Sequence, residues 1–299
     1  MKIAVLTGGT SLERDISLRS GDAVKSAIDT LGYTSQVFDI AEDFLPSLRA
    51  YEPDVAFCAL HGGMGEDGRL QGALEVCGIP YTHSGVLATA LAMDKDKSKA
   101  VMRAANIPVP VGVIASRSQI EAKHVMNVPY VVKPNNDGSS LGGLYLVNDL
   151  QGPPPVIQES THNTFLVEEF IPGIELAASV LGDRGLAITQ FDIEGLYDFE
   201  QKYGQTESNH ILPAQIPSDI EKRVLELACE AHNALGCRGL SRTDFRWDPS
   251  RDQDGIYVLE VNSQPGLRPN SNSGEQAALC GISFPELCDW IIKDASVNR

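Results

Sequence analysis

The sequence has few cysteines and no cysteine motif. Its 299 residues include six cysteines, and none stands in a Cys-x-x-Cys pair. Zinc sites and redox motifs depend on such spacings, and small disulfide-linked proteins have a much higher cysteine density. The sequence therefore disfavours both and predicts buried, reduced thiols at Cys58, Cys77, Cys229, Cys237, Cys280 and Cys288.

The sequence also lacks a long hydrophobic run. No stretch reaches the roughly 18–20 apolar residues of a membrane-spanning helix. The apolar start of the chain is too short for a signal peptide and leads directly into Glu13, Arg14 and Asp15. With 42% hydrophobic and 21% charged residues, the composition is that of an ordinary globular protein. We expect it to be cytoplasmic, without a membrane partner.

Positive charge is scarce. Lys and Arg number 24 against 40 Asp and Glu, which gives a formal charge of −16. Nucleic-acid binding depends largely on Lys and Arg contacts to phosphates, so a nucleic-acid partner is disfavoured. A small anionic ligand is not excluded, because surface charges more than about 8 Å away are screened at physiological salt. Whether such a ligand binds depends on the Lys and Arg side chains and the metal ions next to its site.

A dinucleotide-binding fingerprint is absent as well. The first predicted strand, Lys2–Thr7, ends at Gly8-Gly9-Thr10 instead of a Gly-x-Gly-x-x-Gly turn. This difference disfavours an NAD-binding Rossmann enzyme.

Strands and helices alternate in the first third of the chain. Short apolar runs predict strands at 2–7, 35–40 and 54–60, and apolar spacing predicts a helix over 15–31. Such alternation indicates parallel βαβ units, whose ligands gather at the carboxyl ends of the strands. We therefore expect Gly8-Gly9 and His61-Gly62-Gly63 to border a substrate site.

The remaining chain continues the α/β pattern after a linker at Pro108 and Pro110. A helix is predicted over 87–105, and its Lys97 and Lys99 are interpreted as a solvated face. A second helix is predicted over 219–235. The predicted strands are 128–133, 144–147, 164–171, 176–181, 243–247 and 256–261, and a Gly-rich loop occupies 134–143.

The motifs of the chain resemble those of one enzyme family. Val131-Val132-Lys133-Pro134 and the following Gly138-Ser139-Ser140-Leu141-Gly142 are similar to the phosphate-binding strand and loop of ATP-grasp ligases. Further motifs occur in the order typical of the D-alanine–D-alanine ligase family. They lie at 8–14, 61–68, 71–72, 81–84, 93–95, 197–203, 239–245 and 260–266. The resemblance therefore extends over nearly the whole chain.

This resemblance implies an α/β ATP-grasp fold with an N-terminal parallel-sheet (pre-ATP-grasp) subdomain. Three subdomains are expected, at 1–92, 93–182 and 183–299. The implied activity is ATP-dependent ligation of two D-alanines through an acyl phosphate, for peptidoglycan precursor synthesis. ATP and D-alanine are the implied small-molecule substrates, and a homodimer is expected only from the family.

The nucleotide site is predicted around a lysine and a Gly-rich loop. A Gly- and Ser-rich loop lets N–H groups approach phosphate oxygens, and Lys133 before it adds a compact charge. Taken alone, the loop fits a plain surface turn equally well, and the preceding Lys133 favours the phosphate-binding interpretation. The resemblance assigns ATP binding to Lys95, Lys133, Ser139, Ser140, Glu168, Glu169, Ile171 and Glu175. A charged helix face for Lys95 and an amphipathic edge strand for 167–171 are the open alternatives.

A metal site is predicted from three oxygen-bearing side chains. Asp244, Glu260 and Asn262 come from two predicted strands, and Mg²⁺ prefers such hard oxygen ligands beside phosphates. The resemblance implies two Mg²⁺ ions there, with Mn²⁺ able to substitute. Solvated acids at strand ends are the alternative.

The resemblance also implies catalytic and substrate-binding residues. The catalytic set is Glu13, Ser139, Tyr203, Arg242 and Gly266, and the substrate-binding set is His61, Lys202 and Ser271. Glu13 would hold the first ammonium group, while Arg242 and the N–H of Gly266 would stabilise the oxyanion. The simpler alternatives are an acid near a helix start for Glu13, a structural imidazole for His61 and a turn glycine for Gly266. Residues 197–204 would form a lid over the site, or an ordered surface loop.

One segment departs from the family pattern. Residues 267–275 carry Arg268, Asn272 and Gly274 where Thr, Leu and Pro are usual. A paralogous ligase with another acceptor is therefore the main alternative. A nucleotide-binding regulator without catalysis is disfavoured, because Arg242 and the predicted metal ligands are all present.

Overall fold

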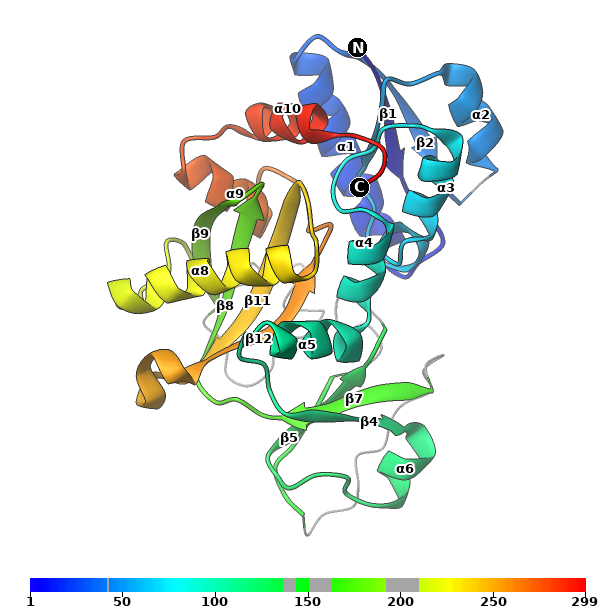
Figure 1. The fold of residues 1–299 in the computed structure, drawn as a ribbon. Helices are drawn as coiled ribbons and strands as arrows, with labels where there is room; N and C mark the ends of the chain where they lie inside the picture. Colours follow the sequence, from blue (N-terminus) through cyan, green and yellow to red (C-terminus); the bar gives the residue numbers. More distant parts are fainter. Residues whose placement is uncertain (42, 137–143, 151–162, 192–209) are drawn as a thin grey trace.

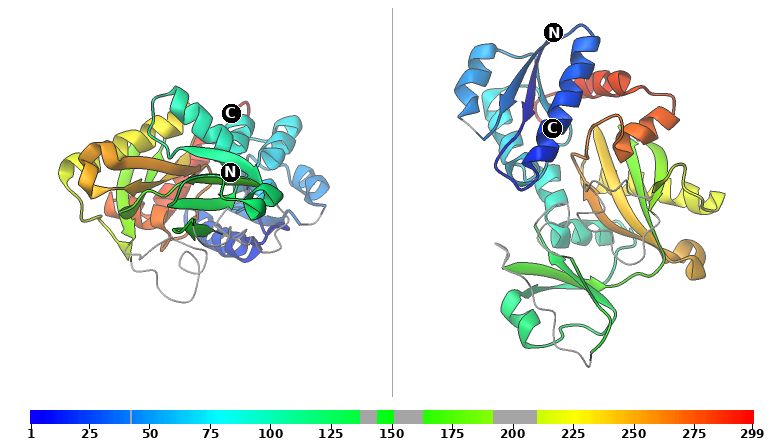
Figure 2. Two further views of the ribbon diagram at one scale, coloured as in Figure 1. Left: turned by 90° about the horizontal axis from the view of Figure 1, so that it is seen from below. Right: turned by 180° about the vertical axis from the view of Figure 1, so that it is seen from behind.

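Three β-sheets organise the chain, and helices cover or connect them (Figure 1). The computed structural model describes residues 1–41, 43–136, 144–150, 163–191 and 210–299. One sheet lies at the end of the molecule that holds both termini, a second lies at the opposite end, and the third lies between them (Figures 1 and 2). The predicted α/β class is confirmed.

The first sheet is parallel, as predicted, with the strand order β2-β1-β3. The elements of this unit are β1 (Lys2–Thr7), α1 (Arg14–Thr30), β2 (Thr34–Asp39), α2 (Phe44–Tyr51), β3 (Val55–Cys58), the short 3₁₀ turn η1 (Gly63–Gly65) and α3 (Arg69–Cys77). Successive side chains of β1 point to opposite faces. Ile3 and Val5 pack in the cluster that contains α1, whereas Ala4 and Leu6 pack with α2 and α3.

The last residues of the chain complete this first unit. Helix α10 (Phe284–Asp294) packs its apolar face into the α1 side of the sheet. Beyond it, Ser296 forms a β-bridge with Tyr81. The backbone N–H groups of Asn298 and Arg299 donate to the Glu75 carboxylate at 2.9 and 3.2 Å. The two termini therefore lie in the same unit (Figure 1).

Two helices replace the single helix that was predicted over 87–105. They are α4 (Val86–Met93) and α5 (Lys95–Ala104). Asp94 separates them with φ −87° and ψ 99°, and its side chain accepts from the backbone N–H of Lys97 at 3.1 Å. An aspartate in this role is a favourable N-cap. The single-helix prediction was therefore wrong, because Asp94 starts a new helix.

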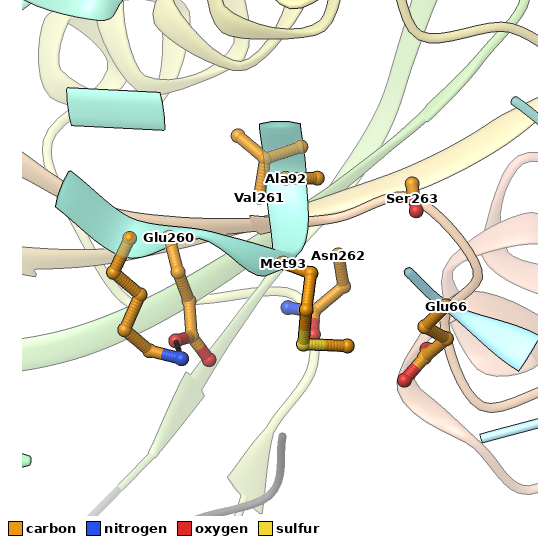
Figure 3. Close-up of a pocket in the computed structure, with 8 residues that line it drawn as sticks. Glu66, Ala92, Met93, Glu260, Val261, Asn262 and Ser263 are labelled. Atoms are coloured by element: carbon orange, nitrogen blue, oxygen red, sulfur yellow. Dashed lines mark ion pairs between the residues drawn. The ribbon is translucent and has the colours of Figure 1, made fainter. Parts of the chain in front are cut away.

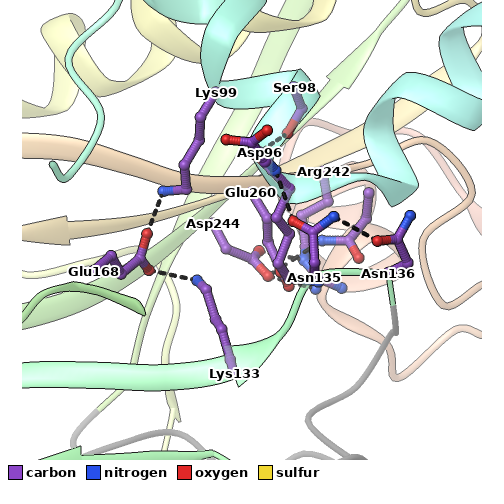
Figure 4. Close-up of polar contacts among 12 residues, drawn as sticks. Asp96, Ser98, Lys99, Lys133, Asn135, Asn136, Glu168, Arg242, Asp244 and Glu260 are labelled. Carbon is purple, nitrogen blue, oxygen red and sulfur yellow. Dashed lines mark hydrogen bonds and ion pairs between the residues drawn. The ribbon is translucent and has the colours of Figure 1, made fainter. Parts of the chain in front are cut away.

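The second sheet is antiparallel, with the order β4-β7-β5-β6. Its elements are β4 (Gly112–Ser116), α6 (Arg117–Ala122), β5 (Tyr130–Pro134), β6 (Tyr145–Val147) and β7 (Thr164–Glu169). Tyr130, Val132 and Phe165 bury one face around Ile120 of α6. The alternate positions, including Lys133 and Glu168, lie on the face toward α5 (Figure 4).

The third sheet has the order β10-β9-β8-β11-β12 and is antiparallel as well. Its elements are β8 (Ile174–Leu181), β9 (Arg184–Phe191), β10 (His210–Ile211), α8 (Ser218–Ala234), β11 (Leu240–Trp247), the 3₁₀ segment η2 (Pro249–Gly255), β12 (Ile256–Asn262) and α9 (Asn272–Leu279). Leu176, Ala178 and Phe245 face α8 in the largest core cluster. Among the strands that the structure describes, the parallel pairing expected from the alternation of strands and helices is therefore confined to the first sheet.

The third sheet crosses residue 182. β8 ends at Leu181 and pairs with both β9 and β11. A boundary between 93–182 and 183–299 would divide this sheet. We propose instead that the second and third subdomains meet at Pro172-Gly173, between β7 and β8.

Two predictions from composition concern the whole chain. Among the helices that the structure describes, none has the length and apolar character that a membrane span needs. All six cysteines are free. Cys58, Cys237 and Cys288 are buried, while the other three are partly exposed.

Candidate active site

Glu13 lies against the loop that follows β3. It is the residue before α1, but its side chain makes no capping hydrogen bond to that helix. Its side chain is 4% exposed. At Gly62 (φ 68°) a Cβ atom would collide with the Glu13 carboxylate, so glycine is required there by both backbone conformation and space. Glu13 does lie at the start of α1, as the simpler interpretation of it as an acid near a helix start expects, and its ammonium-binding role stays a prediction.

His61 is buried beside Glu13. Its ring Nε2 lies 2.9 Å from the Ser20 hydroxyl, and its backbone N–H donates to the Ser17 hydroxyl at 2.9 Å. Burial lowers the pKa of His61 to about 3, so the ring is neutral at physiological pH. A neutral, hydrogen-bonded imidazole suits positioning within the site better than charge pairing with a substrate.

A pocket joins the first unit to the third sheet. Met93 lies between Glu66 on one side and Glu260 on the other, and the pocket is further lined by Ala92, Lys95, Val261, Asn262 and Ser263 (Figure 3). Glu66 accepts from the backbone N–H of Gly62 at 2.6 Å. Burial, and next the Glu13 carboxylate, raise the pKa of Glu66 well above its usual value. The loop after β3 therefore supplies a second carboxyl group, adjacent to the predicted metal ligands.

The predicted metal ligands and Arg242 lie on one face of the third sheet. Asp244 pairs with Glu260 across β11 and β12, and Arg242 pairs with Asn262. The Arg242 guanidinium donates to both oxygens of Asp244 at 2.6 and 2.8 Å. The Asn262 amide donates to the same carboxylate at 3.2 Å. Arg242 and Asp244 therefore point the same way, as residues two apart on a strand do.

This donor set suits Mg²⁺. Within the described ranges, no group of three or more His, Cys, Asp and Glu residues could hold a metal ion. The predicted set contains two carboxylates and one amide oxygen, which are the hard ligands that Mg²⁺ accepts when substrate phosphates complete its coordination. Asp244 is only 7% exposed and shares its charge with Arg242. A metal ion bound there would stand beside the Arg242 guanidinium. The two positive charges together would suit a polyanionic ligand.

The two predicted nucleotide lysines both form ion pairs. Lys95 Nζ lies 3.3 Å from Glu260, and Lys133 Nζ lies 2.6 Å from Glu168. Lys99, interpreted from the sequence as a solvated lysine, is instead buried and lies 2.8 Å from the other oxygen of Glu168 (Figure 4). That interpretation was wrong for Lys99 and holds for Lys97, whose side chain is 64% exposed.

The predicted ATP-binding segment 168–175 is anchored on both sides. Glu169 accepts from the backbone N–H of Val111 at 2.9 Å. The buried Arg246 donates to the carbonyl of Ile171 at 3.1 Å and lies 3.4 Å from Glu175. Arg246 thus fixes the strand ends on either side of Pro172-Gly173, where the second and third sheets meet.

The loop after β12 carries the predicted oxyanion donor toward the first unit. Gln264 donates to the carbonyl of Leu60 at 2.6 Å, which holds the loop against the end of β3. A Cβ atom on Gly266 would make only one ordinary contact, to Ser271 at 3.9 Å. Packing among the described residues therefore does not explain the glycine, whereas close approach of a substrate to its N–H group would.

Ser271 has a structural role that the sequence did not predict. Its hydroxyl caps α9 by accepting from the N–H of Gly274 at 3.3 Å, and it donates to the carbonyl of Arg268 at 2.8 Å. The start of α9 is therefore formed by the segment 267–275 that departs from the family pattern. Four predicted residues, Ser139, Ser140, Lys202 and Tyr203, lie outside the described residues with the predicted lid 197–204.

Two site residues were missed from the sequence. Glu66 belongs to the motif at 61–68 that carries the family resemblance, but the sequence analysis gave it no role. Lys99 is four residues after Lys95, and that spacing places both on one face of a helix. The spacing could have revealed Lys99 once the helix start at Asp94 was recognised.

Comparison with known proteins assigns the chain to a family. A family model described as D-ala D-ala ligase C-terminus matches residues 102–293, and one described as D-ala D-ala ligase N-terminus matches residues 44–84. The chain belongs to the D-alanine–D-alanine ligase family. The predicted family membership is thereby confirmed.

Relatives in this family match over the full chain. The D-alanine–D-alanine ligase of Ruegeria pomeroyi is 51% identical over 298 residues, which cover 100% of this chain and 97% of that protein. The ligase of Cereibacter sphaeroides is 49% identical with the same coverage. The D-alanine–D-alanine ligase from Bacillus anthracis, solved in complex with ATP, is 28% identical with a TM-score of 0.79, over 98% of this chain and 97% of that one. The expected ATP-grasp fold is confirmed.

Proposed function

We propose that this chain uses ATP to ligate two D-alanine molecules into D-alanyl-D-alanine, for peptidoglycan precursor synthesis. The observation that carries the proposal is the shared pocket of Glu66, Lys95, Glu260 and Asn262. It brings the loop beside Glu13 next to the predicted nucleotide and metal residues, so an amino acid and a phosphate donor would meet there. The full-length relatives support the same reaction.

In the first step, the carboxylate of one D-alanine attacks the γ-phosphorus of ATP and ADP leaves, which gives an acyl phosphate. Glu13 would hold the ammonium group of that D-alanine. Lys95 and Lys133 would hold the phosphates, with Glu168, Glu169, Ile171 and Glu175 around the nucleoside. Asp244, Glu260 and Asn262 would bind Mg²⁺ or Mn²⁺, which supplies charge neutralisation for phosphoryl transfer.

In the second step, the amine of the second D-alanine attacks the acyl carbon, and phosphate leaves after a tetrahedral intermediate. Arg242 and the N–H of Gly266 would stabilise the oxyanion. Ser271, whose hydroxyl caps α9, would stand at the acceptor carboxylate, as the resemblance implies, together with backbone N–H groups at the start of that helix. Ser139, Ser140, Lys202 and Tyr203 keep their predicted roles at the phosphates and the lid.

The paralogous alternative, a ligase with another acceptor, gains no support. The relatives named D-alanine–D-alanine ligase match the whole chain, including 267–275. A cytoplasmic location remains a prediction from the sequence, and a homodimer remains a prediction from the family.

The test is phosphate release from ATP and Mg²⁺ with D-alanine, L-alanine and a panel of D-amino and D-hydroxy acid acceptors. Release with D-alanine alone, with D-alanyl-D-alanine identified by mass, is the expected result. Release that requires a different second acid would overturn the acceptor assignment. Asp244→Asn serves as the inactive control, because it removes a proposed metal ligand and the partner of Arg242.

A further inference from the structure

Lys99 is a buried lysine that the proposed reaction does not use. It lies one helical turn after Lys95 on α5, so the two side chains point to the same side. Both are buried, with side chains 1% and 9% exposed. Lys97, on the opposite side of the helix, is 64% exposed and pairs with Asp96. Burial of a lysine is costly unless it has a partner, so the place of Lys99 needs an explanation.

The partner of Lys99 is shared with a predicted nucleotide lysine. Glu168 directs one carboxylate oxygen to Lys99 at 2.8 Å and the other to Lys133 at 2.6 Å (Figure 4). Burial raises the pKa of Glu168, but Lys133 and Lys99 outweigh it and hold that pKa below the usual value. Glu168 is therefore an ionised carboxylate between two ammonium groups.

The geometry of α5 fixes this arrangement. Asn135, directly after β5, donates to the Asp94 carboxylate at 2.8 Å and accepts from the backbone N–H of Asp96 at 2.9 Å. Its carbonyl accepts from the N–H of Lys95 at 3.1 Å. The start of α5 is thus attached to the strand that carries Lys133. The spacing between Lys99, Glu168 and Lys133 follows from that attachment.

The charges of this trio do not balance. Two ammonium groups share one carboxylate, which leaves one positive charge in a buried place. Glu260 also attracts both lysines of the trio, but its direct ion pair is with Lys95. Within the described part of the chain, neither Lys99 Nζ nor Glu168 Oε2 has a well-aligned hydrogen bond. If these three residues served only the stability of the fold, an uncharged residue in place of Lys99 would be more favourable. Glu168 and Lys133 would then form a neutral buried pair.

We propose that Lys99 is a positioning residue of the nucleotide site, which shares Glu168 with Lys133 and so leaves one ammonium charge uncompensated for the phosphates of ATP. This inference rests on the ATP-dependent function proposed above. Burial lowers the pKa of Lys99 to about 8 against the attraction of Glu168.

The test compares Lys99→Met with Lys97→Met in the full chain. The first removes the buried charge with little change in volume, and the second removes a solvated charge from the same helix. Phosphate release gives the KM for ATP and for D-alanine, and competition gives the inhibition constant of adenosine, which has no phosphate. Thermal melting checks that each variant is folded, and Lys99→Gln replaces Lys99→Met if the latter does not fold.

Lys99→Met should raise the KM for ATP about tenfold or more, as expected when one nearby charge is lost in a partly buried site. The adenosine constant and the KM for D-alanine should stay within about twofold, as should every value for Lys97→Met. Lys99→Arg should restore most of the ATP affinity. An unchanged KM for ATP, or a parallel loss of adenosine binding, would overturn the role of Lys99. Absence of ligation by the wild-type chain would instead overturn the proposed function.

Discussion

Gly8 shows how one residue supports the first substrate loop. Its φ of 73° is in the left-handed region, and a Cβ atom there would collide with the Asp39 carboxylate. Asp39 receives two hydrogen bonds from Arg14, at 2.5 and 3.0 Å, and one from the N–H of Gly9 at 3.0 Å. Hydrogen bonds from Arg14 hold the pKa of Asp39 well below its usual range. Asp39, the last residue of β2, therefore holds the loop before Glu13 in place.

Gly8→Ala should destabilise the protein more than Gly32→Ala. Both glycines have left-handed φ, at 73° and 77°, and the alanine strain of about 1–2 kcal/mol applies to each. Nothing lies within 4 Å of a Cβ atom at Gly32. Gly8→Ala also displaces Asp39, so we expect it to lose about 2 kcal/mol more. Urea unfolding measures the difference, and equal losses would show that Asp39 moves without cost.

The site residues were predictable where a motif carried them. Arg242 and Asp244 lie two apart on one strand, so their common direction followed from the period of a strand. The burial of Lys99 did not follow, since a lysine on a polar helix is usually solvated and its partner is about 70 residues away in the chain. The capping role of Ser271 required the start of α9, which apolar spacing did not mark.

At the scale of elements, α5 connects the two sheets of the nucleotide site. Its start is attached to β5 through Asn135, and its remaining length packs against α8 and β12. Asn135 is 4% exposed. Its side chain therefore decides how Lys95 and Lys133 are placed relative to each other.

Asn135→Ala should lower stability by about 1–3 kcal/mol, because the N–H of Asp96 and the Asp94 carboxylate lose a buried partner. The KM for ATP should rise as well, since both nucleotide lysines depend on this attachment. Asn106→Gly is the matched control at the other end of α5, where a φ of 59° suits glycine. Chemical unfolding and steady-state kinetics measure both effects. An Asn135→Ala variant with unchanged KM would show that α5 needs no such attachment.

The elements themselves were predicted unevenly. The strand 2–7 and the parallel order of the first sheet were confirmed, because a continuous apolar run between turns is a local signal. The break at Asp94 was missed although Asp is a common N-cap. The pairing of β8 with β9 and β11 joins segments up to about 70 residues apart, and local spacing carries no information about such pairing.

At the scale of the whole molecule, buried neutral histidines tie stability to pH. Burial lowers the pKa of His232 to about 4, while its Nδ1 lies 2.7 Å from the Ser241 hydroxyl between α8 and β11. The unfolded chain takes up a proton near pH 6.5, whereas the folded protein does so only near pH 4. The histidine therefore costs no stability above pH 6.5, and stability is lost as pH falls from there toward 4.

His232→Gln should make the free energy of unfolding less sensitive to pH, because the variant lacks the one proton that the unfolded wild type takes up at this histidine. Between pH 7.5 and 5.5 the wild type should lose about 1.4 kcal/mol more than the variant, since one proton over one pH unit is worth about that amount. Urea unfolding at both pH values measures the difference. Above pH 7.5 the two pH curves should be parallel, which provides the internal control. Curves that stay parallel to pH 5.5 would show that His232 is protonated in the folded protein.

The return of the chain end to the first sheet bears on how the protein is made. The α1 side of that sheet is covered by α10, and Tyr81 pairs with Ser296. A ribosome synthesises the sheet first and its cover last, so the apolar face of α1 stays open during most of translation. Nascent chains with such exposed faces are prone to aggregation. We therefore expect the N-terminal unit to be the last part of the chain to reach its native packing in the cell.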